Sequence, residues 1–75
     1  MVHFTNITFD DEWVYADAYN CSSKVQCKVK INRKSEQFFS NYTDNGTFNK
    51  AMLYVLIDVE DGKLEQNSER VVNWG

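Results

Sequence analysis

The chain has 75 residues, of which 43% are hydrophobic and 15% aromatic, and its formal net charge is −3. A chain of this length buries only about 60% of the surface that its unfolded form exposes, so it has no room for a large enclosed active-site cavity beside a core. We therefore expect one small domain spanning residues 1–75. The negative net charge argues against a general nucleic-acid binder.

The chain also lacks the sequence patterns of membrane and secreted proteins. Its longest apolar run, residues 51–57, is much shorter than the roughly 20 residues of a membrane-spanning helix. The N-terminus does not show the basic and apolar segments of a secretory signal. We therefore expect a cytoplasmic protein with no membrane partner.

The two cysteines and the single histidine predict neither a disulfide nor a metal site. Cys21 and Cys27 lie six positions apart, which is about 20 Å in an extended chain and beyond the reach of a disulfide. The only histidine, His3, is remote from both, and no paired-ligand spacing occurs. We expect no metal and no cofactor, with Cys27 as a small core residue and Cys21 as an exposed thiol.

The clearest structural pattern is a strict alternation of polar and apolar residues over 24–31. This period of two predicts a strand with one face in a core and the other in water. Residues 2–9 and 13–19 are rich in β-branched and aromatic residues, and we expect strands in both. Residues 36–43 contain three aromatic residues and predict a further strand, which a sharp turn at residues 44–46 would end.

The chemistry of the hairpin formed by residues 13–19 and 24–31 suggests how its strands pair. If Asn20 opposes Ser23, one side of the hairpin is wholly apolar, whereas a slip of one residue would mix the two faces. Opposed side chains are close enough to touch. The expected pairs are Ala18 with Val25, Ala16 with Cys27 and Val14 with Val29 on the apolar side, and Tyr19 with Lys24, Asp17 with Gln26, Tyr15 with Lys28 and Trp13 with Lys30 on the other.

Residues 48–60 fit two kinds of structure. On a helix, apolar residues recur at the spacing of a single face, Thr47 is placed to cap the N-terminus, and Gly62 is placed to end the helix. On a strand, residues 51–59 alternate instead, and the fold would be all-β and barrel-like. Because alanine, methionine and leucine favour helices, we predict a helix over residues 48–60.

These elements together predict an α+β fold, with the all-β barrel-like fold as the alternative. An antiparallel sheet of three to four strands comes from residues 2–43, the helix at about 48–60 packs against it, and the C-terminal tail lies alongside. The helix would leave three apolar residues on its far side, to be covered by tail residues or by a partner. These three are Leu53, Tyr54 and Ile57, and the tail residues are Val71, Val72 and Trp74.

The aromatic and lysine residues of the hairpin form the candidate binding surface. Rings on a sheet can stack on bases while lysines meet phosphates, as in single-stranded nucleic-acid binders. Alternatively, the lysine stems lie over the rings and shield them from water, or the rings lie under the helix. We favour shielding, because no RNA-binding motif accompanies the surface. Its residues are Trp13, Tyr15, Tyr19, Lys24, Lys28 and Lys30.

No arrangement of catalytic residues is recognisable, so we expect the protein not to be an enzyme. The acidic pairs Asp10–Asp11 and Glu60–Asp61 are neighbours in sequence, whereas an acid/base pair needs two carboxylates held across a cleft. The acidic residues near the end of the predicted helix would be unfavourable there unless a cation or basic partner neutralised them, and we interpret them as solvated loop charge. His3 lies at a terminus that we expect to be mobile.

An interaction protein is the function that remains. Aromatic residues dominate the binding energy of protein interfaces, and so small a body cannot bury all of its large rings. We predict a non-enzymatic protein-interaction module, a small regulatory or inhibitory binder of the kind that phages and mobile elements encode, with homodimer formation through Leu53, Tyr54 and Ile57 as one version. The alternative is a single-stranded nucleic-acid binder that uses the aromatic and lysine residues of the hairpin.

Overall fold

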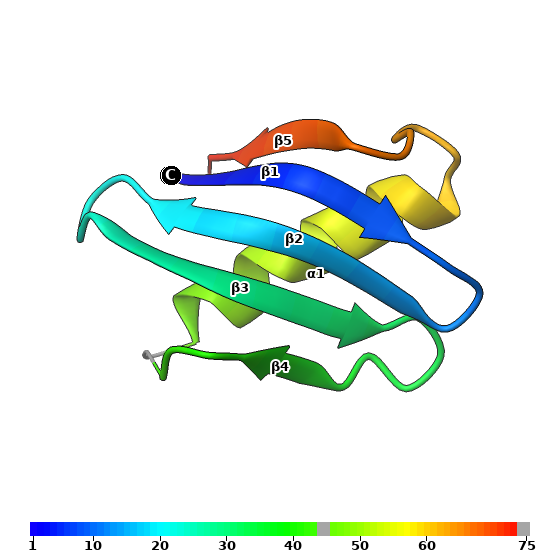
Figure 1. Cartoon of the computed structure of the whole chain (residues 1–75), viewed down its shortest axis with the longest axis horizontal. Coiled ribbons are helices and arrows are strands. Elements are labelled where there is room, and N and C mark those ends of the chain that lie inside the picture. The colour runs from blue at the N-terminus through cyan, green and yellow to red at the C-terminus, as the bar shows by residue number, and fades with distance from the viewer. Residues whose placement is uncertain (44–45, 74–75) are drawn as a thin grey trace.

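A computed structural model describes residues 1–43 and 46–73, which form one antiparallel sheet of five strands and one helix. The strand order is β4-β3-β2-β1-β5, and α1 crosses one face of the sheet, behind the strands in Figure 1. The predicted α+β class is confirmed, and the all-β alternative is wrong. The elements are β1 (Val2–Phe9), β2 (Trp13–Asn20), β3 (Val25–Asn32), β4 (Phe38–Ser40), α1 (Thr47–Glu60) and β5 (Ser68–Val72).

The sheet has five strands, not three or four, because the C-terminal segment joins the edge of β1. Val71 of β5 pairs with His3, so the histidine lies within a strand and not at a loose terminus. Charged residues of β5 hide its alternation in the sequence. The strand expected over 36–43 shrinks to three residues in β4. Asp44 and Asn45 of the predicted turn lie outside the described residues.

The core lies between α1 and one face of the sheet. At the centre of β2, Ala16 and Ala18 present small buried side chains that leave room for the helix. The helix places Phe48, Met52 and Val55 against them, and all three are fully buried. The predicted apolar side of the hairpin therefore faces α1, and the interpretation that buried its aromatic rings under the helix is wrong.

A bulge in β1 sets which residues of that strand reach the core. Asn6 has a φ of 52°, a left-handed conformation that asparagine tolerates better than most residues. The pairing of β1 with β2 shifts between Thr5 and Thr8. As a result Phe4 and Ile7, three positions apart, are both fully buried.

Strands β2 and β3 pair two residues away from the expected register. Asn20 lies opposite Val25 and not Ser23. A shift of two residues keeps every side chain on its own face, so the apolar pattern cannot tell the two registers apart. The expected faces are therefore correct and the expected pairs are wrong. The observed pairs on the polar side are Trp13 with Asn32, Tyr15 with Lys30, Asp17 with Lys28 and Tyr19 with Gln26.

A four-residue loop between β2 and β3 explains the shift. The side-chain Oδ1 of Asn20 accepts a hydrogen bond from the Ser22 amide at 2.9 Å, and its carbonyl accepts one from the Lys24 amide at 2.7 Å. Lys24 has a φ of 59°, so it closes the loop and does not face Tyr19 from a strand as expected. The loop between β3 and β4 repeats this pattern, starting at Asn32.

The helix starts and stops through its two flanking glycines. Gly46 is the N-cap with a φ of 92°, and Thr47, the predicted cap, is already the first helical residue. At the other end Gly62 has a φ of 70°, and its amide donates to the Val59 carbonyl at 3.0 Å. The next amide bonds the Asp58 carbonyl at 2.9 Å, which completes the C-terminal glycine motif predicted from the sequence.

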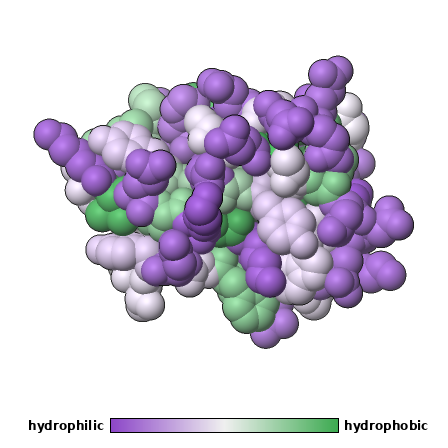
Figure 2. All heavy atoms as spheres, in the orientation of Figure 1, coloured by the Kyte–Doolittle hydropathy of each residue, from purple (hydrophilic) through white to green (hydrophobic). Residues whose placement is uncertain are grey.

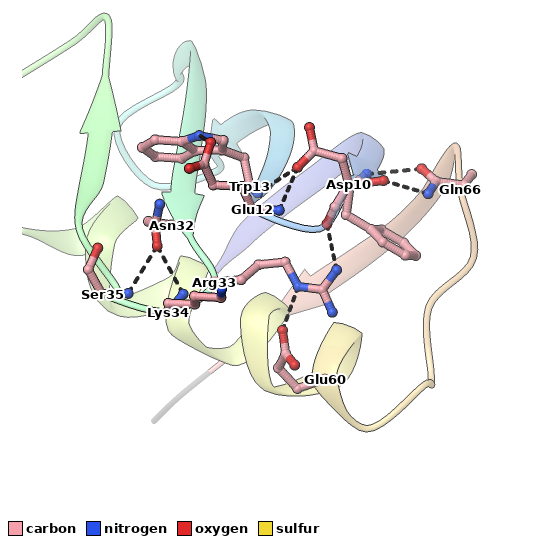
Figure 3. Close-up of polar contacts among 10 residues, drawn as sticks. Asp10, Glu12, Trp13, Asn32, Arg33, Lys34, Ser35, Glu60 and Gln66 are labelled. Carbon is pink, nitrogen blue, oxygen red and sulfur yellow. Dashed lines mark hydrogen bonds and ion pairs between the residues drawn. The ribbon is translucent and has the colours of Figure 1, made fainter.

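Arg33 ties together three segments at one end of the sheet (Figure 3). Its Nε donates to Glu60 Oε1 of α1 at 2.7 Å, and its Nη1 donates to the Asp10 carbonyl of the β1–β2 loop at 2.5 Å. The guanidinium carbon lies 5.8 Å from the centre of the Phe9 ring. The backbone amide of Arg33 also donates to the Glu12 carbonyl at 2.8 Å.

The acidic residues at the end of α1 are therefore paired within the chain. Glu60 is held by Arg33, and Asp58 is held by Arg70 of β5. Both pairs offset negative charge at a helix C-terminus, where it is otherwise unfavourable. The interpretation of Asp58 and Glu60 as solvated loop charge is therefore wrong. The sequence does not reveal these pairs, because the two arginines are far from the acidic residues along the chain.

Side-chain amides extend the hydrogen bonding of the sheet where its edge strands are too short. The Gln66 side chain accepts from the Phe9 amide at 2.9 Å and donates to the Phe9 carbonyl at 2.7 Å. On the opposite edge, Asn41 Oδ1 accepts from the Lys28 amide at 2.9 Å. Each amide takes up backbone groups that a longer edge strand would have paired.

We expect Arg33→Ala to lower the free energy of unfolding by about 1–2 kcal/mol, because it removes two charge-assisted hydrogen bonds from a partly exposed site. Urea unfolding followed by circular dichroism measures the effect. Lys34→Ala, one residue away, is the matched control and should change stability little. Equal losses in the two variants would contradict this role of Arg33.

Candidate functional site

No described element covers the face of the sheet opposite α1, which we call the open face. Figure 2 views the molecule from this side, and it shows pale aromatic rings interspersed with hydrophilic side chains. The strands supply these side chains at alternate positions, as their pairing and burial require. The open face comprises His3, Thr5, Thr8, Trp13, Tyr15, Asp17, Tyr19, Gln26, Lys28, Lys30, Asn32, Phe39, Glu69 and Val71.

Aromatic rings on the open face remain accessible to solvent. Tyr15 is 38% exposed, Tyr19 37% and Phe39 43%. Their backbones belong to paired strands, so the rings are presented from a rigid support. A partner that covered them would gain apolar burial without first having to order a loop.

Trp13 is the most firmly held ring of the open face. Its indole Nε1 donates to Glu12 Oε2 at 2.9 Å. The ring centre lies 5.8 Å from that of Phe39, at an interplanar angle of 60°. Lys30 Nζ sits 4.4 Å from the Trp13 ring centre and 5.6 Å from the Phe39 ring centre. Lys30 thus makes two cation–π contacts, as expected if lysine side chains lie over the rings and shield them from water.

Lys28 is committed to a different partner. Its Nζ donates to Asp17 Oδ1 at 2.8 Å, and Asn6 Nδ2 donates to the other carboxylate oxygen at 2.9 Å. These two hydrogen bonds, that of Lys28 first, lower the pKa of Asp17 below its ordinary value of 3.8. Lys24, expected to join the same row, lies exposed in the β2–β3 loop.

A shallow depression of about 280 Å³ lies over β3 and β4 on the open face. Its lining contains two lysines and no acidic residue, which favours an anionic group in an incoming partner. The lining residues are Tyr15, Lys28, Val29, Lys30, Phe39, Ser40 and Asn41.

The structure does not bring the predicted helix residues to the open face. Leu53 is half-buried against the core, while Tyr54 and Ile57 are exposed on α1, which covers the other face of the sheet. Val72, expected to cover them, is a buried core residue, and Val71 lies exposed on the open face. Trp74, the third expected cover, lies outside the described residues.

Three residues that shape the open face, Phe39, Asp17 and Glu69, were absent from the predicted surface. Phe39 could have been found, because alternation in β4 turns it away from its half-buried neighbour Phe38. The partnership of Asp17 with Lys28 depends on the register, which the sequence leaves open. Glu69 belongs to the C-terminal tail, for which no strand was predicted, and its Oε1 lies 3.2 Å from His3 Nε2 across β1 and β5.

The described residues include two free thiols and one tyrosine with a shifted pKa. No group of three metal-ligating side chains occurs among residues 1–43 and 46–73, and no helix there is long and apolar enough to cross a membrane. Partial burial, reinforced by the nearby Asp10 carboxylate, raises the pKa of Tyr15 above its ordinary value of 10.0. Cys21 is an exposed free thiol and Cys27 a buried one.

Comparison with known proteins adds no family. No family model matches the chain, and neither the curated proteins nor the solved structures contain a significant match.

We expect the protein to lose stability in acid, because three carboxyl groups are held ionised by native contacts. Hydrogen bonds lower the pKa of Asp10, Asp17 and Glu60 below their ordinary values of 3.8, 3.8 and 4.5. A lowered pKa gives stability that is complete above the ordinary value and is lost as the pH falls through the folded-state value. Urea unfolding at pH 7 and at successive steps below pH 4.5 measures this loss.

Asp17→Asn serves as the control for the acid effect. It cannot be protonated, so its stability should depend less steeply on pH below 4 than that of the wild type. A wild-type stability that stays constant down to pH 2.5 would contradict the native contacts described for these three carboxylates.

Proposed function

We propose that the chain is a non-enzymatic protein-interaction module and that the open face is its binding surface. The observation that carries this proposal is the set of exposed rings of Tyr15, Tyr19 and Phe39 on a face that no described element covers. Tyrosine and other aromatic residues are enriched in the energetic centres of protein interfaces. Mixed polar and aromatic faces of this kind are typical of non-obligate interfaces.

The charges of the open face favour a protein partner over a nucleic acid. Binding to single strands draws on cations that are free to replace counterions along the phosphate chain. The open face offers a chain of phosphates only two lysines, Lys28 and Lys30, and each already contacts another group of the face, Asp17 in one case and the Trp13 and Phe39 rings in the other. The net charge of −3 adds a general repulsion of phosphates.

The open face is also a better binding surface than the outer side of α1. The helix exposes two large apolar residues, Tyr54 and Ile57, one turn apart. The open face exposes three rings, and these continue into the lining of the depression. A wider cluster of rings removes more apolar surface from water on binding.

A regulatory or inhibitory role in the cytoplasm fits this proposal. Such a role needs a binding surface and no catalytic group, which is what the open face offers. The exposed free thiol of Cys21 supports a reducing compartment, since exposed thiols in oxidising compartments tend to form disulfides.

The test is to compare an open-face variant with a helix variant as immobilised baits. We expect Tyr19→Glu to lose the partner that the wild type retains from an extract of the source cells, because a charge replaces a ring that must be desolvated on binding. Ile57→Glu, the same kind of change on α1, should retain it. The purified partner is then titrated against all three proteins by calorimetry, and we expect at least a tenfold weaker Kd for Tyr19→Glu alone.

Two results would contradict the proposal. One is loss of the partner with Ile57→Glu but not with Tyr19→Glu, which would move the binding surface to α1. The other is quenching of tryptophan fluorescence by a single-stranded oligonucleotide at low salt that Lys28→Glu abolishes, which would favour nucleic acid. Circular dichroism of each variant confirms that the fold is retained.

A further inference from the structure

The two halves of the open face carry different charges, with lysines on the β3–β4 half and a glutamate on the β1–β5 half. On β3, Lys28 and Lys30 are its charged residues, and neither neighbours an acid on the β4 side. On the opposite half, Glu69 of β5 carries a carboxylate whose side chain is 70% exposed and whose Oε1 lies 3.2 Å from His3 Nε2. Aromatic residues of β2 occupy the middle, together with Asp17, which accepts a hydrogen bond from Lys28. A face that is basic on one half and acidic on the other complements a copy of itself.

The strand order converts this division into a specific arrangement. Because β2 is the middle strand of five, a twofold axis along β2 lays the β3–β4 half of one sheet over the β1–β5 half of a second copy. The strands of the two sheets then run in nearly the same direction, as in aligned sheet packing. The rings of β2 from both copies meet at the axis.

The register places the opposite charges at the same height along that axis. Lys28 and Thr5 both pair with Asp17, so they share one row across the sheet. Glu69 lies opposite the bulge of β1 formed by Thr5 and Asn6, at the level of the same row. The rotation therefore carries Glu69 of one copy toward the depression beside Lys28 of the other.

The size of the open face is sufficient for such a pairing. The molecule measures 31 by 21 Å across this face, a footprint of about 650 Å². Two such faces would bury roughly 1,300 Å² in total, which falls within the range of about 1,200–2,000 Å² for specific complexes. The interface would lie at the lower end of that range, so we expect an exchanging dimer.

We propose that the open face binds a second copy of the chain, face to face about a twofold axis along β2, with Glu69 of each copy between Lys28 and Lys30 of the other. This inference rests on the proposed function and names the partner of the same surface. It differs from the dimer expected through Leu53, Tyr54 and Ile57, because those residues belong to α1 on the other side of the sheet.

The test is a charge exchange between two variants, followed by sedimentation velocity and light scattering from micromolar to millimolar concentrations. We expect the wild type to approach twice its 8.8 kDa mass as concentration rises. Glu69→Lys alone and Lys28→Glu alone each place like charges together twice and should weaken the dimer at least tenfold. An equimolar mixture restores both opposite-charge pairs, and we expect it to dimerise more strongly than either variant by itself.

Ile57→Glu on α1 is the matched control and should dimerise like the wild type. Glu69→Ala and Lys28→Ala provide a second pair if Lys28→Glu, which faces Asp17, does not fold. Each should weaken the dimer, and the two effects should not add, because both remove the same contact.

Failure of this inference can be distinguished from failure of the proposed function. A wild type that stays monomeric at millimolar concentration, or a mixture no stronger than its components, would overturn the second copy as the partner. The function proposed above would still stand if Tyr19→Glu abolished binding of a different protein. A dimer disrupted by Ile57→Glu but not by the open-face variants would overturn this inference, because it would place the contact between copies on α1.

Discussion

The packing of a single helix on one face of the sheet is the constraint from which the rest of the structure follows. Ala16 and Ala18 on β2 leave space for Phe48 and Met52, and the resulting core uses the inward side chains of every long strand. Residues 1–43 and 46–73 contain no second helix with which to cover the other face. The outward rings must therefore be protected by their own neighbours or by another molecule.

The fold class was predictable from local signals, and the pairing was not. Strict alternation identified β3 and the face that it buries, and Gly62 marked the end of α1. The register depends instead on loop chemistry, since Asn20 opens a four-residue loop where a two-residue turn was assumed. The fifth strand was missed because Arg70 and Glu69 conceal its period, and Arg70 takes an inward position only because Asp58 of α1 receives it.

The candidate surface was predictable in kind and not in detail. Its rings and lysines were expected on one face, and they lie there, apart from Lys24 in its loop. What the sequence cannot show is which cation meets which group. Lys30 contacts the Trp13 and Phe39 rings and Lys28 contacts the Asp17 carboxylate. These contacts depend on the register of β2 with β3 and on the position of β4, which are set by long-range strand pairing. The same holds for Arg33, whose partners come from two distant segments.

The side-chain amides at the sheet margins have a consequence for how copies of this molecule can accumulate. Gln66 and Asn41 occupy main-chain groups that would otherwise recruit the strand of a neighbour, and the outermost strand β4 is only three residues long. Lateral growth from sheet to sheet, the route toward filaments and amyloid, therefore finds these main-chain groups already bonded, and among the described strands β5 offers the longer edge. Association through the open face, as proposed above, gives a closed dimer and adds no strand to the sheet.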